Sequence, residues 1–248
     1  MSRPASPLCS TLAMTGMELR LTPRRGENVL VTIVIPATVL LFFASVGILP
    51  AVAGRPVDFL LPGSLALAII ATSLVNLGIV TAYDRHYGVL KRLGGSPLPR
   101  AGLLAAKMLA VLVVELVQVA LLVGIATLLL GWQPSANASI LAAAASLVLG
   151  TLVFAGLGLL MAGRLRAEGT LAGANGLFLV FLLLGGIVVP IDHLPAPLAA
   201  IAAVLPANTL SAAFRAALGS GDTLGPLAAL AAWAVVTVGL SAATFRWE

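Results

Sequence analysis

Six long stretches nearly free of charged residues dominate this sequence, and each has about the length that crosses a lipid bilayer. The hydrocarbon core of a bilayer takes about 20 consecutive apolar residues of helix to span. Only 9% of the 248 residues are charged and 60% are hydrophobic, so little polar surface is available to cover a water-soluble domain. The chain is therefore predicted to be an integral membrane protein, with residues 1–248 forming a single transmembrane domain.

Each apolar stretch is predicted to be a helix, because a lone segment in lipid must satisfy its own backbone hydrogen bonds. The sequence thus predicts an all-α fold with six transmembrane helices. The predicted spans are Val29–Leu49, Phe59–Thr81, Leu103–Leu130, Ile140–Ala162, Leu171–Val189 and Leu224–Thr244.

The basic residues indicate which side of the membrane each loop occupies, because cytoplasmic loops carry an excess of Lys and Arg. If the N-terminus is cytoplasmic, 12 of the 14 basic residues fall on that side, and Arg55 and Arg215 remain outside. Both termini are therefore predicted to be cytoplasmic. A pI near 10.4 would suggest nucleic-acid binding in a soluble protein, but here topology explains it, and we expect no nucleic-acid partner.

Three segments do not fit a spanning helix. Residues 10–22 place Leu12, Met14 and Met17 among small and polar residues, which favours a short helix in the cytoplasmic interface, with a disordered tail as the alternative. Residues 83–100 form a basic cytoplasmic loop with an apolar and cationic middle, ended by Gly and Pro.

The third segment, residues 190–221, is too apolar for an ordinary outer loop and is interrupted by four prolines. Two short segments, Pro197–Leu205 and Asn208–Leu218, fit between the breaks, and each is far shorter than a span. We expect a re-entrant hairpin in the outer leaflet between the fifth and sixth spans, with its backbone buried against protein.

The sequence carries no motif for catalysis or for nucleotide binding. A Walker A loop is absent, no span holds two carboxylates, and both histidines, His86 and His193, fall in predicted loops. Cys9 is the one cysteine, so an internal disulfide is excluded. We expect no catalytic residue, no metal site and no cofactor bound by this chain.

A few polar residues inside the spans are the candidates for function. Glu115 and Gln118 lie one turn apart in the third span, near mid-bilayer. A carboxyl there must face a bundle or a cavity, either as a substrate or proton-sensitive site or as a structural residue that binds a neighbouring helix. We expect a neutral acid that donates to Asn76, Gln118 or a backbone carbonyl. Asn76 and Asn175 are expected to join helices.

The loop YDRHYGVLKRLGGSPLPR, together with the layout of spans, resembles the permease subunits of type-2 ABC exporters over the whole chain. In that family this loop carries a charged cluster, a Gly, apolar residues that flank basic ones, and Ser/Thr-Pro. His86 and Tyr87 depart from the pattern. The matching residues are Asp84, Arg85, Gly88, Leu90, Lys91, Arg92, Leu93, Ser96 and Pro97.

The resemblance implies that this loop couples the permease to a separate ABC ATPase subunit, which would hold ATP and Mg²⁺. It implies a second permease copy or a sister permease as a further partner, in the cytoplasmic membrane of a prokaryote. Leu90 and Leu93 are then expected in a groove of the ATPase, with Arg85, Lys91 and Arg92 on its acidic rim.

The substrate is predicted to be hydrophobic or amphipathic, a drug or a lipid, because Leu, Ala, Val and Gly make up most of the spans. Glycan or glycolipid export is the alternative within the family. Outside transport, the chain would be a membrane assembly factor or a small intramembrane enzyme.

Overall fold

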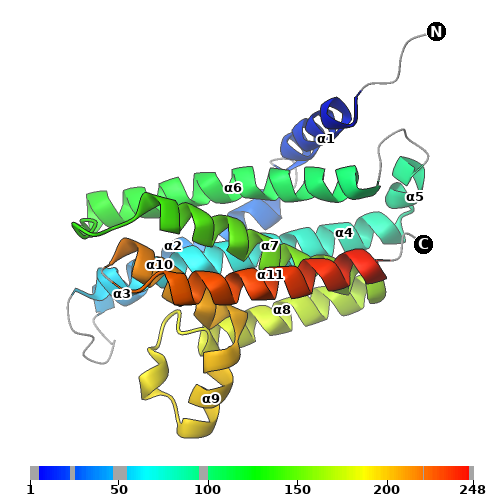
Figure 1. Ribbon diagram of the computed structural model, residues 1–248. Coiled ribbons are helices and arrows are strands. Elements are labelled where there is room, and N and C mark those ends of the chain that lie inside the picture. The colour runs from blue at the N-terminus through cyan, green and yellow to red at the C-terminus, as the bar shows by residue number, and fades with distance from the viewer. Residues whose placement is uncertain (1–5, 23–25, 47–54, 95–99, 220, 246–248) are drawn as a thin grey trace.

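The computed structural model describes residues 6–22, 26–46, 55–94, 100–219 and 221–245, which form helices joined by turns (Figure 1). Five helices are long and apolar enough to cross a membrane, and α2 adds the shorter apolar stretch Thr32–Val46. The prediction of an all-α integral membrane protein is confirmed. The helices are α1 (Pro7–Leu21), α2 (Gly26–Val46), α3 (Pro56–Ile69), the π-helical η2 (Ile70–Asn76), α4 (Leu77–His86), α5 (Val89–Gly94), α6 (Arg100–Leu129), α7 (Ile140–Arg164), α8 (Ala167–Leu184), the 3-10 turn η3 (Ile191–His193), α9 (Ala196–Val204), α10 (Pro206–Leu218) and α11 (Leu224–Thr244).

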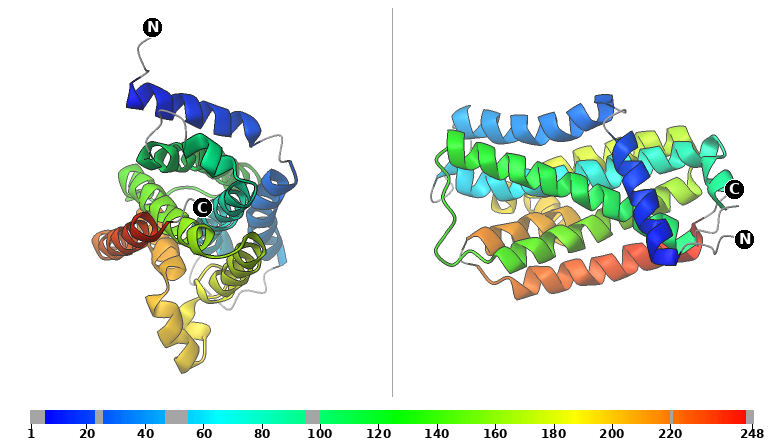
Figure 2. Two further views of the ribbon diagram at one scale, coloured as in Figure 1. Left: turned by 90° about the vertical axis from the view of Figure 1, so that its right-hand side faces the viewer. Right: turned by 90° about the horizontal axis from the view of Figure 1, so that it is seen from above.

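The spanning helices run roughly parallel to one axis, and α1 lies across them at one end (Figure 2). That end also carries α5 and the basic turn between α7 and α8, so we name it the cytoplasmic end. The opposite, outer end holds the start of α3 and the loop between α6 and α7. Helix α1 begins three residues before the predicted residue 10, because Ser6 caps it by accepting from the Cys9 backbone N–H at 3.3 Å.

The second span is one continuous helix, Pro56–His86, built from α3, η2 and α4. It extends beyond the predicted Phe59–Thr81 at both ends, with Pro56 in the first turn, where its missing N–H removes no hydrogen bond. Most of this helix is buried in the middle of the bundle. It ends near Gly88, whose φ of +69° turns the chain into α5.

Helix α7 packs closely against this central span. A Cβ placed on Gly158 would lie 2.8 Å from the Leu74 carbonyl oxygen and 2.9 Å from that of Ser73. A Cβ placed on Gly78 would in turn lie 3.1 Å from the Cα of Gly158. Small residues let two membrane helices approach to backbone contact, and here they bring α7 onto η2 and α4.

The predicted boundaries fail most at the fifth span. Helix α8 occupies Ala167–Leu184 and not the predicted Leu171–Val189. Gly185 donates to the Phe181 carbonyl as the cap of the helix, and Gly186 follows with a φ of +60°, so the chain leaves the helix there. The sixth span, in contrast, matches its prediction at both ends.

The outer hairpin consists of α9 and α10, which meet at an angle of 76°. Helix α10 is buried against the bundle, as expected, through residues such as Leu210 and Phe214. Helix α9 projects from the side of the bundle (Figures 1 and 2), and Ala202 is the buried residue within it. The expectation that the whole hairpin is buried against protein is therefore wrong for α9 in a single chain.

Candidate functional site

The cytoplasmic end presents a turn and a short helix formed by the predicted coupling loop. Helix α4 ends at His86, the chain turns at Gly88, and α5 then covers Val89–Gly94. Arg85 donates a hydrogen bond from its guanidinium to the Leu165 carbonyl, which ties this turn to the one between α7 and α8. Ser96 and Pro97 lie outside the described residues.

Leu90 corrects one expectation about this loop. It was predicted to enter a groove of the ATPase, but it is 1% exposed and packs against Met14 of α1 and against Leu103 and Ala106 of α6. Leu93 packs at the edge of the same cluster. A side chain with no free surface cannot also dock into a partner, so Leu90 holds α5 on its own chain.

Among the described residues of this loop, the exposed side chains are His86, Tyr87, Lys91 and Arg92. Tyr87 is 65% exposed, and its ring lies 5.1 Å from that of His86, centroid to centroid. Arg92 donates to the Tyr87 carbonyl at 3.4 Å. The two residues that depart from the family pattern are thus part of the exposed surface of this turn, together with the two cations.

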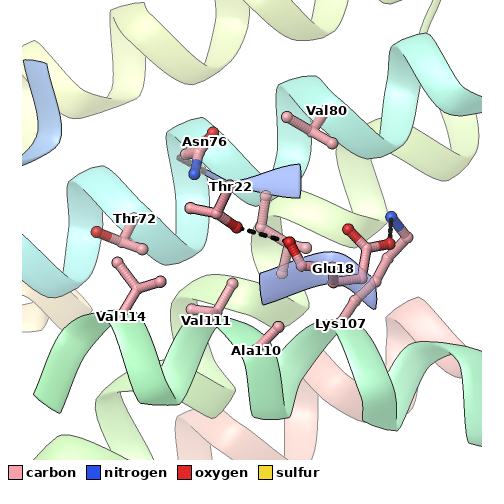
Figure 3. A pocket seen from close by; sticks show the side chains of 10 residues that line it. Glu18, Thr22, Thr72, Asn76, Val80, Lys107, Ala110, Val111 and Val114 are labelled. Carbon is pink, nitrogen blue, oxygen red and sulfur yellow. Dashed lines mark hydrogen bonds and ion pairs between the residues drawn. The ribbon is translucent and has the colours of Figure 1, made fainter. Parts of the chain in front are cut away.

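Asp84 was also assigned to ATPase docking, and the structure gives it a partner within the chain. Its carboxylate lies 2.8 Å from Nζ of Lys107, which in turn lies 2.7 Å from Oε1 of Glu18. The Lys107 side chain is 2% exposed. This ionic cluster joins α1, α4 and α6, and Figure 3 shows its Glu18 and Lys107. Sequence reasoning missed it, although a lysine so close to an apolar span requires an acidic partner.

A small cavity lies next to the ionic cluster, between α1, the central span and α6 (Figure 3). Its volume is about 40 Å³, and Thr72 and Asn76 line it on one side and Val111 on the other. A cavity of this size accommodates ordered water but no drug or lipid. In a single chain it is therefore not a substrate site.

Glu115 lies deeper in the bundle and is fully buried. Its carboxyl accepts hydrogen bonds from Ser73 of η2, at 2.5 Å, and from Thr151 of α7. The predicted partners Asn76, Gln118 and a backbone carbonyl are therefore wrong. The predicted helix interface is present, but the partners are hydroxyls, which sequence reasoning overlooked because Ser and Thr are unremarkable in an apolar span.

Gln118 forms a second part of this buried polar network. Its Oε1 accepts from Thr72 of η2 at 2.9 Å, and its Nε2 donates to the Thr32 carbonyl of α2 at 3.1 Å. Together with Glu115 it connects four helical elements through side chains that are all buried. The π-helical segment η2 supplies a hydroxyl to each residue, and such segments are frequent at functional sites.

The two asparagines have separate surroundings. Asn76 lines the small cavity beside the ionic cluster. Asn175 is exposed on α8 and donates to the Leu171 carbonyl of its own helix at 2.9 Å. Neither joins the Glu115 network, and a role in a substrate pathway or in an interface with another chain stays a prediction for both.

Comparison with known proteins identifies the family to which this chain belongs. No curated protein matches the sequence. The model of the ABC-2 type transporter family matches residues 10–218, from the interfacial helix to the end of α10. This match covers most of the chain, including the ionic cluster, the coupling turn and the buried polar network. The chain belongs to the ABC-2 type transporter family and is a transmembrane permease component of an ABC transporter.

Proposed function

We propose that this chain is the permease of an ATP-driven exporter that moves a hydrophobic or amphipathic molecule, a drug or a lipid, out of a prokaryotic cell. A separate ABC ATPase subunit would bind ATP and Mg²⁺. The observation that carries the proposal is the exposed group of His86, Tyr87, Lys91 and Arg92 on a turn that is fixed to the bundle. Arginine and aromatic rings are enriched where proteins bind each other, and this group contains Arg92 and Tyr87.

The contacts of this turn support a mechanical link between an ATPase and the spans. Leu90 packs α5 on α1 and α6, and Lys107 joins α1 and α6 to Asp84 of α4. A displacement of α5 by a partner is therefore passed to three helices at once, because packed apolar contacts and buried ion pairs resist separation. Arg85 extends the link to the turn before α8.

The surfaces of the chain support the proposed substrate class and a second permease copy. The cavity beside α1 holds only about 40 Å³, and the larger apolar cavity among α3, α6, α7 and α10 is lined by the exposed Leu116 and Ile140 at the surface of the bundle. A pathway for a drug or lipid is therefore expected between two permease copies or sister chains. Apolar side chains such as Leu128, Leu183 and Val235 are exposed around the bundle, which suits lipid and a second permease. Few polar groups are present to bind a glycan.

Charge reversal at the coupling turn tests the link to the ATPase. We expect Lys91→Glu/Arg92→Glu to abolish co-purification with the partner ABC ATPase and to remove its substrate-stimulated ATP hydrolysis. Arg164→Glu/Arg166→Glu is the matched control, because it makes the same charge change at exposed residues of the same end. Survival of the complex in the first variant, or equal loss in both, would contradict the proposal.

The substrate is tested by the ATPase activity of the reconstituted complex. Lipids, hydrophobic drugs and polysaccharide precursors are added separately to proteoliposomes, and stimulation by the first two classes is expected. Stimulation by polysaccharide precursors alone would favour the glycan exporter. A chain that purifies without an ATPase and shows no ATP-dependent transport would instead be an assembly factor.

A further inference from the structure

Two adjoining cavities lie at the outer end of the bundle, far from the coupling turn. One has a volume of about 240 Å³ and is lined by Arg55, Asp58 and Arg215. The other, of about 330 Å³, lies among α3, α6, α7 and α10 and is lined almost wholly by apolar side chains. Trp132 and Leu218 line both. A polar chamber therefore continues into an apolar one along a shared wall.

The polar chamber has a positive charge balance. The chamber is lined by Arg55 and Arg215, which are the two basic residues predicted to lie on the outer side of the membrane. Asp58 is the acidic residue in the same lining. Arg55 is paired with Asp58 at 3.3 Å and donates to the Gly131 carbonyl at 2.9 Å. One positive charge thus remains without a counter-charge in the lining of this chamber.

Arg215 supplies that charge. Its guanidinium lies 4.5 Å from the centre of the Phe59 ring and donates one hydrogen bond, to the Gly186 carbonyl. Its Nε is buried and has no hydrogen-bond partner among the residues that the structure describes. A guanidinium has five N–H donors and binds phosphate in a two-pronged geometry, so this group is suited to an anion with several oxygens.

The apolar chamber opens towards lipid. Leu116 and Ile140, on α6 and α7, line it and are 51% and 87% exposed, whereas Phe214 forms its inner wall and is 2% exposed. Along α6 the lining runs from Leu116 to Val123, a rise of roughly 10 Å. The chamber therefore follows the membrane normal, as an acyl chain does.

We propose that the joined cavities bind an anionic phospholipid of the outer leaflet. Its phosphate lies between Arg55 and Arg215, and one acyl chain lies along the apolar chamber between α6 and α7. Along the membrane normal, a charged chamber is followed by an apolar one, which matches the headgroup and acyl chain of a phospholipid. An anionic lipid is favoured because a zwitterionic headgroup would bring a second positive charge into a cationic chamber. The inference concerns binding alone and holds whether or not that lipid is transported.

Trp132 reports on this site directly because it lines both chambers. The variant Trp233→Phe/Trp247→Phe leaves Trp132 as the only tryptophan of the chain. This variant is placed in phosphatidylcholine nanodiscs that contain phosphatidylglycerol with brominated acyl chains, or brominated phosphatidylcholine at the same mole fraction. We expect the anionic lipid to quench Trp132 several-fold more strongly. Equal quenching by the two lipids would overturn the proposal.

Variants then assign the preference to the arginines. Arg55→Gln/Arg215→Gln should make quenching by the two lipids equal. Arg55→Gln alone should reduce the preference for the anionic lipid. Because Arg55 is exposed, this variant keeps the packing of Arg215. Arg164→Gln/Arg166→Gln, which removes two charges at the cytoplasmic end, should leave the preference intact. An unchanged preference in both Arg55 variants, or equal loss in this control, would refute the site.

The apolar chamber has a test of its own. Ala143 lines it and is partly exposed, so Ala143→Phe places a ring where the acyl chain is proposed to lie. Quenching of Trp132 by brominated phosphatidylglycerol should then fall to the level of brominated phosphatidylcholine. Quenching that stays at the parent level would show that the chain does not occupy this chamber.

Discussion

Removal of the buried cation at Lys107 should detach the interfacial helix from the bundle. Lys107 is 2% exposed and lies within 2.8 Å of carboxylates from both Glu18 and Asp84. Lys107→Met keeps the length of the side chain but removes the cation that lies between the carboxylates of Glu18 and Asp84. Loss of one partner of a buried ion pair costs about 3–5 kcal/mol. At about 1.4 kcal/mol per factor of ten, the unfolding constant rises at least 100-fold.

The assay combines stability with a local probe. Unfolding is followed in detergent mixtures, and a nitroxide on Cys9, the one cysteine and an exposed residue of α1, reports the mobility of that helix. Lys107→Met should lower stability and release the nitroxide. Glu18→Gln, which leaves the pair with Asp84 intact and an amide oxygen to accept from Nζ, should cost about 1 kcal/mol.

A triple variant separates charge from packing. Glu18→Gln/Asp84→Asn/Lys107→Met contains no charge in the cluster, so it should recover most of the lost stability, since a neutral replacement of a whole buried ionic group is often well tolerated. If the triple variant is as unstable as Lys107→Met, the lysine acts through packing of its stem. If Lys107→Met itself unfolds like the parent, the cluster does not hold α1.

Three further predictions concern the inside of the bundle. Glu115→Gln should change the free energy of unfolding by less than about 1 kcal/mol, because an amide can pair with both hydroxyls. Glu115→Leu should cost about 1–3 kcal/mol, because two buried hydroxyls lose their acceptor. Unfolding in detergent measures both variants. Gly158→Ala should destabilise the protein by separating α7 from η2, while Gly124→Ala, at a glycine with open space, should be neutral or stabilising in the same assay. Leu90→Asp should impair folding of the permease alone, measured by size-exclusion chromatography without the ATPase, and a normal elution profile would restore Leu90 to the docking surface.

The exposed turn proposed to couple to an ATPase could be predicted from sequence only in part. The pattern indicated a turn with exposed Lys91 and Arg92, which the structure has, because charge and Gly act locally. It assigned Leu90 and Asp84 to a partner because a short sequence cannot reveal that α1 and α6 cover the same loop. The residues that departed from the pattern, His86 and Tyr87, belong to the exposed face. Burial depends on contacts with distant segments, which a local pattern does not contain.

What the sequence alone determined is the membrane class and the approximate spans, since hydropathy over about 20 residues decides these without reference to other segments. The sixth span, Leu224–Thr244, was therefore predicted to the residue. Only the tertiary structure brought Glu18 to Lys107, 89 positions along the chain, and Ser73 and Thr151 to Glu115. In an apolar bundle many helix faces have similar composition, so the close packing of the helices decides which polar groups come into contact.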